Sequence, residues 1–124
     1  LYCYPVFDRP AVEAGGNALL REIEALIACF SPYSQEREQF SLALYGTSET
    51  LRIDGEGRVV LTDALKAHAG ITDAVIFVGL GHKFRLWEPG RFRAELVEAT
   101  EKVRAFRHEL GTRTAAGKPP GARE

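Results

Sequence analysis

The stretch LRIDGEGRVVL, residues 51–61, decides the fold because it has the pattern of a β-hairpin. Apolar residues stand on both sides of Asp54-Gly55 and a second glycine, Gly57, and this pattern is the strongest short-range hairpin signal in a sequence. Asp54 can accept a hydrogen bond from its own backbone two residues on, and glycine takes positive φ without penalty. We therefore predict two strands around a tight turn, with Arg58 at its mouth.

The residues after this hairpin predict a short helix and two more strands. Thr62 is placed to cap a helix that Gly70 ends. AVIFVGL at residues 74–80 has the pattern of a buried strand, and FRLW at 84–87 that of a further strand after a Gly81-His82 turn. The predicted order is strand, D-x-x-G-R turn, strand, short helix, strand, strand.

This order and three motifs resemble the MraZ family, bacterial DNA-binding regulators built from two AbrB-like copies. The motifs are FSLALYG at 40–46, D-x-x-G-R at 54–58 and VGLGHKFRLWE at 78–88. The resemblance, which runs from residue 1 to about residue 110, implies an α+β fold: an AbrB-like swapped-hairpin β-barrel with flanking helices, its second repeat complete and its first truncated. The chain departs from the pattern at Thr62, where AbrB-like domains usually carry proline, but a threonine N-cap can start the same helix.

The resemblance also implies a function and a site. Family members form ring-like homo-oligomers in the cytoplasm, at the nucleoid, and bind G-rich repeats in double-stranded DNA upstream of the division and cell-wall gene cluster. Arg58 would contact base edges, since a guanidinium matches O6 and N7 of guanine, while Arg52 and Lys66 would hold phosphates. The residues expected to shape the turn are Asp54, Gly55 and Gly57.

Two other classes of function remain as alternatives. The first is an antitoxin-like or other protein-interaction module with the same fold and no DNA binding of its own. The second is an enzyme, which the residues do not favour: the three histidines lack the spacing of a metal site, and Asp54 and Glu56 on an exposed tip gain no burial that would raise a pKa. We expect no catalytic residue, no metal and no cofactor.

Composition limits the partners. The chain of 124 residues is 45% hydrophobic, enough for a core, yet no apolar run approaches the length of a membrane span, so we expect no membrane partner. The formal charge of −1 means that DNA contact must come from a local patch, repeated by oligomerisation. Cys3 and Cys29 lack C-x-x-C spacing and are expected to be reduced.

An internal repeat suggests how the chain is organised. The sequence has no methionine, so we expect a fragment or a processed form. Residues 1–5 parallel residues 84–89, each an apolar strand with a proline before a helix, but no hairpin precedes the first copy. We expect residues 1–46 to be the remnant of a first AbrB-like repeat, residues 47–110 a second AbrB-like domain, and residues 111–124 a disordered tail.

Three long helices are expected around these strands. The first starts at Asp8 and Pro10, runs to Phe30 and is weakened at Gly15-Gly16, and the second begins at Ser34 and ends at Gly46. The third, at about 91–110, carries an apolar seam that packs either on the first helix of its own chain or on another subunit.

Overall fold

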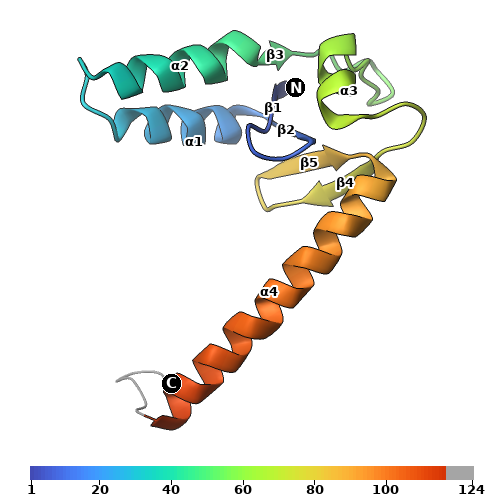
Figure 1. The fold of residues 1–124 in the computed structure, drawn as a ribbon. Helices are drawn as coiled ribbons and strands as arrows, with labels where there is room; N and C mark the ends of the chain where they lie inside the picture. The colour runs from blue at the N-terminus through green and yellow to red at the C-terminus, as the bar shows by residue number, and fades with distance from the viewer. Residues whose placement is uncertain (117–124) are drawn as a thin grey trace. The chain divides into compact units, whose positions relative to one another are not determined.

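The computed structural model describes the backbone of residues 1–116 and the side chains of residues 1–111. The chain forms two compact units, Leu1–Pro89 and a second that begins at Gly90, and each is described by itself. The elements in chain order are β1 (Tyr2–Pro5), β2 (Ala11–Gly15), α1 (Asn17–Ala28), α2 (Gln35–Thr47), β3 (Glu49–Thr50), α3 (Asp63–Ala69), β4 (Ile76–Gly79), β5 (Lys83–Trp87) and α4 (Pro89–Ala116) (Figure 1).

One antiparallel sheet organises the first unit. Its five strands lie in the order β3-β1-β2-β5-β4, so β2 and β5 are central and β4 is at one edge. The strands β1 and β2 form one hairpin, β4 and β5 form another, and the two hairpins pair through β2 and β5 with Glu13 opposite Arg85. The fold is thus the mixed α and β architecture that was expected, with two hairpins paired edge to edge in one sheet.

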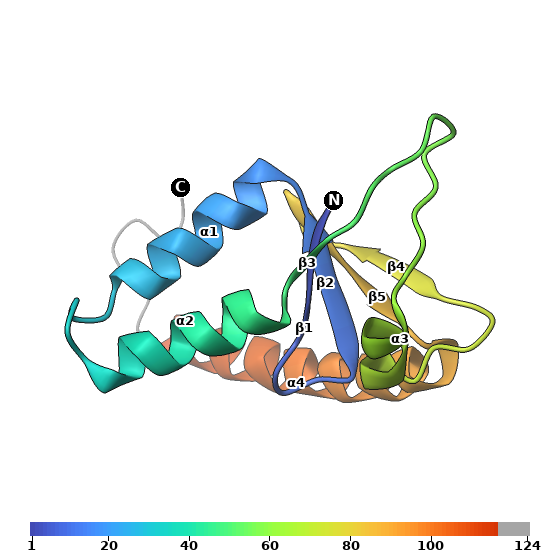
Figure 2. The same ribbon diagram turned by 90° about the horizontal axis from the view of Figure 1, so that it is seen from above.

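Helices cover both faces of this sheet. Figure 2 shows α1 and α2 on one side and α3 on the other. The residues buried towards α3 are Cys3, Val12, Ala14, Leu51, Leu65, Ala69, Ile71 and Leu86. Those buried towards α1 and α2 are Tyr2, Leu19, Ile23, Ile27 and Leu44. Neighbouring residues of β1 therefore belong to different clusters, as the two-residue period of a strand requires.

The short helix α3 forms as predicted. The side chain of Thr62 accepts a hydrogen bond from the backbone N–H of Leu65 at 3.4 Å, and Gly70 ends the helix at a φ of 70°. The Thr62 hydroxyl also donates to Glu49 Oε2 at 2.8 Å, which ties the start of α3 to β3. Thr62 is therefore the N-cap of α3, at the position where AbrB-like domains usually carry proline.

The helix predicted to start at Asp8 and Pro10 begins later than expected. Ala11–Gly15 is the strand β2, and α1 begins at Asn17. The prediction was wrong because β2 is paired on both sides, and its backbone hydrogen bonds to β1 and β5 outweigh the local helical pattern. At Gly15, a Cβ atom would lie 2.9 Å from Cβ of Leu19, so glycine here lets α1 pack closely against the end of the strand.

The arms of the predicted hairpin at 51–61 are not strands in this structure. The turn itself is present, closed by bonds from Asp54 N to Arg58 O at 2.9 Å and from Gly57 N to Asp54 O at 3.1 Å. The first arm instead pairs with the start of the chain, where Leu51 N donates to Leu1 O at 2.7 Å. An isolated two-stranded ribbon is only marginally stable in water, and no described strand pairs with residues 59–61.

The proposed correspondence between residues 1–5 and 84–89 was also wrong. Residues 1–5 hold β1, which is followed by β2 rather than by a helix, so β1 corresponds in position to β4 and β2 to β5. Each hairpin is then followed by a helix, α1 or α4. Strands from both predicted repeats share one sheet, and the division of the chain into AbrB-like repeats stays a prediction.

Two helix ends differ from expectation. Helix α2 continues through Gly46 to Thr47, although its start at Ser34 is confirmed by the bond from Arg37 N to the Ser34 hydroxyl. Helix α4 runs to Ala116, beyond the predicted boundary at residue 110, and residues 117–124 of the predicted tail lie outside the described residues. Among the described helices, none has both the length and the apolar content to cross a membrane.

Candidate nucleic-acid interface

The carboxylate of Asp54 organises the turn at residues 54–58. Its Oδ1 accepts from the backbone N–H groups of Glu56 and Arg58, each at 2.9 Å, and its Oδ2 accepts from Arg58 Nε at 3.0 Å. These bonds hold the pKa of Asp54 below its usual value, and the bond from the Arg58 backbone has the largest effect. Gly57 has a φ of 81°, so the turn requires glycine there. Gly55 has no positive φ and open space around it.

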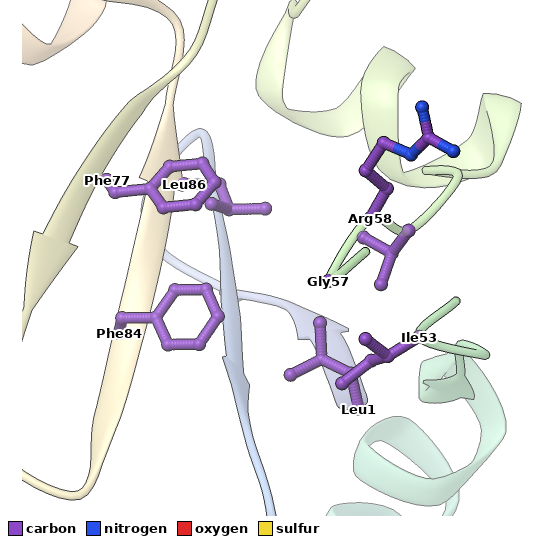
Figure 3. Close-up of a pocket in the computed structure, with 8 residues that line it drawn as sticks. Leu1, Ile53, Gly57, Arg58, Phe77, Phe84 and Leu86 are labelled. Carbon is purple, nitrogen blue, oxygen red and sulfur yellow. The ribbon is translucent and has the colours of Figure 1, made fainter. Parts of the chain in front are cut away.

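Arg58 is presented to solvent from this turn. Its side chain is 70% exposed, and Nη2 lies 3.5 Å from Glu56 Oε2. Figure 3 shows its guanidinium directed away from the neighbouring apolar hollow. Because the bond to Asp54 uses Nε, the side chain is oriented at its base while the end of the guanidinium faces outward.

The two other predicted cations lie elsewhere on the same segment. Arg52 is exposed on the first arm, next to the buried Leu51. Lys66 is on α3, with Nζ 3.8 Å from Asp63 Oδ1. In Figure 2 the turn stands at the far end of the arms from α3, so the structure does not bring Lys66 beside Arg58. The three predicted DNA contacts are therefore spread over residues 52–66, with Arg52 and Arg58 on the projecting arms and turn and Lys66 on the packed helix α3.

An apolar hollow of about 460 Å³ lies between the arms and the hairpin β4–β5. Figure 3 shows Phe77, Phe84 and Leu86 on one side of it and Leu1 and Ile53 on the other. Phe77 stacks on Phe84 with ring centroids 5.7 Å apart, yet Phe77 stays 68% exposed. Large apolar side chains with this exposure are typical of a surface that another chain segment covers.

Comparisons with known proteins match this segment and most of the rest of the chain. The family model described as "MraZ protein, putative antitoxin-like" matches residues 44–110. The chain is 64% identical over 113 residues to the transcriptional regulator MraZ of Xanthobacter autotrophicus, covering 91% of this chain and 72% of that protein. It is 56% identical over 129 residues to the protein of the same name from Methylocella silvestris, covering 100% and 79%.

The chain belongs to the MraZ family. The resemblance inferred from the three motifs is thereby confirmed. The segment that matches the MraZ model contains the whole 54–58 turn together with Arg52 and Lys66.

A buried ion pair in this MraZ chain was missed by the sequence analysis. Glu13 on β2 is 1% exposed, and its Oε1 accepts from Arg85 Nε on β5 at 2.9 Å. The Tyr4 hydroxyl donates to its other oxygen, from which Lys83 Nζ lies 3.5 Å away. Burial and this hydrogen bond raise the pKa of Tyr4 far above its usual value. The sequence signal for it was the alternation of apolar and polar residues in Val12-Glu13-Ala14, which is typical of a strand but was interpreted as part of a helix.

This cluster joins the two hairpins and ties β5 to α1. Lys83 also donates to Glu22 Oε2 at 2.6 Å, and His82 Nε2 lies 2.5 Å from Glu22 Oε1, which links β5 to α1. On the other face, His68 Nε2 contacts the backbone oxygens of Val6 and Arg9 at 2.8 and 3.0 Å. No group of side chains among the described residues has the composition of a metal site.

Proposed function

We propose that this chain is a transcriptional regulator that binds double-stranded DNA through the turn at residues 54–58. The observation that carries the proposal is the exposed Arg58 guanidinium, which Asp54 orients through Nε on a turn that projects from the sheet. Holding a side chain in its binding conformation reduces the entropy lost on binding. Its relatives are named transcriptional regulators, and the MraZ model covers the turn.

Each cation of the segment has its own role in this proposal. Arg58 enters the major groove and donates to O6 and N7 of a guanine. Arg52 on the arm and Lys66 on α3 contact phosphates, which position the protein without carrying sequence information. The targets are G-rich repeats upstream of the division and cell-wall gene cluster, and the protein acts at the nucleoid in the cytoplasm.

Oligomerisation supplies several turns to one DNA molecule. The formal charge of −1 gives no general attraction to DNA, so repeated local contacts must supply the affinity. The apolar hollow beside the turn and the outer edge of β4, which no described strand pairs, support closure by a hairpin of a second copy. Such closure would complete an AbrB-like barrel and lead to a ring-like homo-oligomer.

Light scattering over a range of protein concentrations tests this assembly. We expect a mass above that of a monomer, falling when Phe77 is replaced by aspartate, because Phe77 lines the hollow and is largely exposed. Tyr33→Asp is the matched control, since Tyr33 is fully exposed at the loop between α1 and α2. A monomer at every concentration would contradict the proposed assembly.

Fluorescence anisotropy with duplexes that carry G-rich repeats, or scrambled repeats, tests the DNA proposal. Replacing Arg58 with alanine should weaken binding by about 1 to 3 kcal/mol per engaged site and relax base preference there, and lysine should not restore it. Replacing Lys66 with alanine should weaken binding to both duplexes equally and lower the salt slope by about 0.9 per lost contact. Arg21→Ala on an exposed part of α1 is the control. Unchanged binding by the Arg58 variants would contradict the proposal.

An antitoxin-like or other protein-interaction module is the second candidate, and the description of the matching family model favours it. In that case the exposed apolar hollow would receive a segment of another protein, and the arginine of the turn would face solvent. The two candidates differ in salt dependence, because release of counterions makes DNA binding fall steeply as salt rises. Absence of salt-dependent DNA binding by the oligomer would favour the module.

A further inference from the structure

Glu56 occupies the tip of the turn between two glycines. Its side chain is 73% exposed, while those of Gly55 and Gly57 are absent, so it has open space on both sides. In the part of the chain that the structure describes, its one ion-pair partner is Arg58, with Glu56 Oε2 3.5 Å from Arg58 Nη2. The tip therefore presents a carboxylate and a guanidinium side by side.

The two carboxylates of the turn have different surroundings. Asp54 accepts three hydrogen bonds from within the turn, so its oxygens are occupied in shaping it. Glu56 makes a single exposed ion pair, and such pairs are weak and readily exchanged for other partners. Of the two, Glu56 is the carboxylate that can accept a hydrogen bond from a ligand without dismantling the turn.

We propose that Glu56 reads a base, accepting a hydrogen bond from the N4 amino group of a cytosine next to the guanine that Arg58 contacts. This inference rests on the proposed function of the turn. Glu56 Oε2 and Arg58 Nη2 lie 3.5 Å apart, close to the spacing of about 3.4 Å between successive base pairs, so the two side chains can reach neighbouring base pairs. Cytosine N4 is the base-edge donor that matches a carboxylate in the major groove.

The charge of Glu56 makes this contact selective. A carboxylate at the tip is repelled by phosphates, and at a base pair without a suitable donor it would be buried without a partner. Cytosine offsets that loss by donating to the carboxylate. Glu56 should therefore weaken binding to sequences that lack the cytosine more than it strengthens binding to those that have it, which is how an unfavourable interaction produces specificity.

The experiment compares Glu56→Gln and Glu56→Ala with the unaltered chain on duplexes that carry each of the four base pairs at every position of the repeat. The position that Arg58 contacts is identified as the guanine whose preference is lost in Arg58→Ala. At the position next to it, the unaltered chain should prefer cytosine by about tenfold, and both Glu56 variants should lose that preference. Glutamine should raise binding to adenine there, because its amide matches N6 and N7 of adenine. Glu24→Gln on an exposed part of α1 controls for the loss of one negative charge.

The outcomes separate this inference from the proposed function. Suppose that Arg58→Ala loses the preference for guanine at its position, while the Glu56 variants bind every sequence more tightly by the same factor. Glu56 then acts through its charge alone and the inference is overturned, although the proposed DNA binding stands. If Arg58→Ala changes nothing, the proposed function fails first. A Glu56→Asp variant keeps the charge on a shorter side chain, and its retention of part of the cytosine preference would support a direct contact. An equal loss at the guanine position in all Glu56 variants would show a disturbed turn and overturn the inference.

Discussion

Replacing Glu13 with alanine should lower the free energy of unfolding by about 3 kcal/mol, the low end of the range for breaking a buried ion pair. Glu13 is 1% exposed, so its removal leaves Arg85 facing a cavity in place of its carboxylate partner. The low end applies because the side chains of Arg85 and Lys83 are 30% and 19% exposed and can reach water. Lys83 also keeps Glu22 as a partner at 2.6 Å.

Urea unfolding followed by circular dichroism measures this loss. With a denaturant slope of about 1 to 3 kcal/mol/M, the midpoint should fall by about 1 to 3 M. Glu13→Gln preserves the shape and an acceptor oxygen, so it should cost only about 1 kcal/mol, the difference between a charged and a neutral hydrogen bond. Glu24→Gln, at an exposed position of α1, should stay within about 0.5 kcal/mol. If Glu13→Ala matched that control, the pair would not join the two hairpins as described.

Three further predictions follow from other contacts. Gly15→Ala should destabilise the chain in the same urea assay, because the new Cβ would stand 2.9 Å from Cβ of Leu19. Gly16→Ala should cost less, because its Cβ would meet no atom within 4 Å and the change loses only the preference for glycine over alanine at the N-cap of α1. The hydrogen bond from Lys83 lowers the pKa of Glu22 from its usual value of 4.5, so the ionised Glu22 stabilises the fold above that pH and the stabilisation is lost as the pH falls below it. The difference in free energy of unfolding between the unaltered chain and Glu22→Gln should therefore shrink from pH 7 to pH 3. A difference that stays constant would contradict this. Burial raises the pKa of the Cys3 thiol to about 11, so a thiol reagent should label the exposed Cys29 rapidly in the folded chain and Cys3 only after unfolding, and rapid labelling of both would refute the buried position.

Features set by neighbouring residues could be predicted from the sequence. The caps at Ser34 and Thr62 and the helix end at Gly70 lie where local side-chain and backbone chemistry places them. The turn at 54–58 was also predicted, since Asp54 bonds to backbone groups two and four residues away. Each of these interactions closes within a few residues, so the pattern of residue types is enough to indicate it.

The central strand β2 and the ion pair it carries were decided by tertiary structure. Ala11–Gly15 has a composition that suits a helix or a strand, and its partners β1 and β5 decide between them. Glu13 and Arg85 are far apart in the chain, and only the register of β2 with β5 places them opposite each other. The arms at 51–61 show the converse, since they have a strand pattern, but residues 59–61 find no partner among the described strands and the arms form no ladder.

For the candidate site, the sequence by itself determined the turn, its glycine and its arginine, because a turn is a local structure. The tertiary structure decided that Lys66 stands away from Arg58 and that the arms border an apolar hollow. It also showed that, among the described residues, Glu56 makes a single exposed ion pair with Arg58, whereas Asp54 accepts three hydrogen bonds within the turn. The physical reason is that strand pairing and side-chain partners depend on residues distant in the chain, whose positions are settled only when the hairpins join in one sheet.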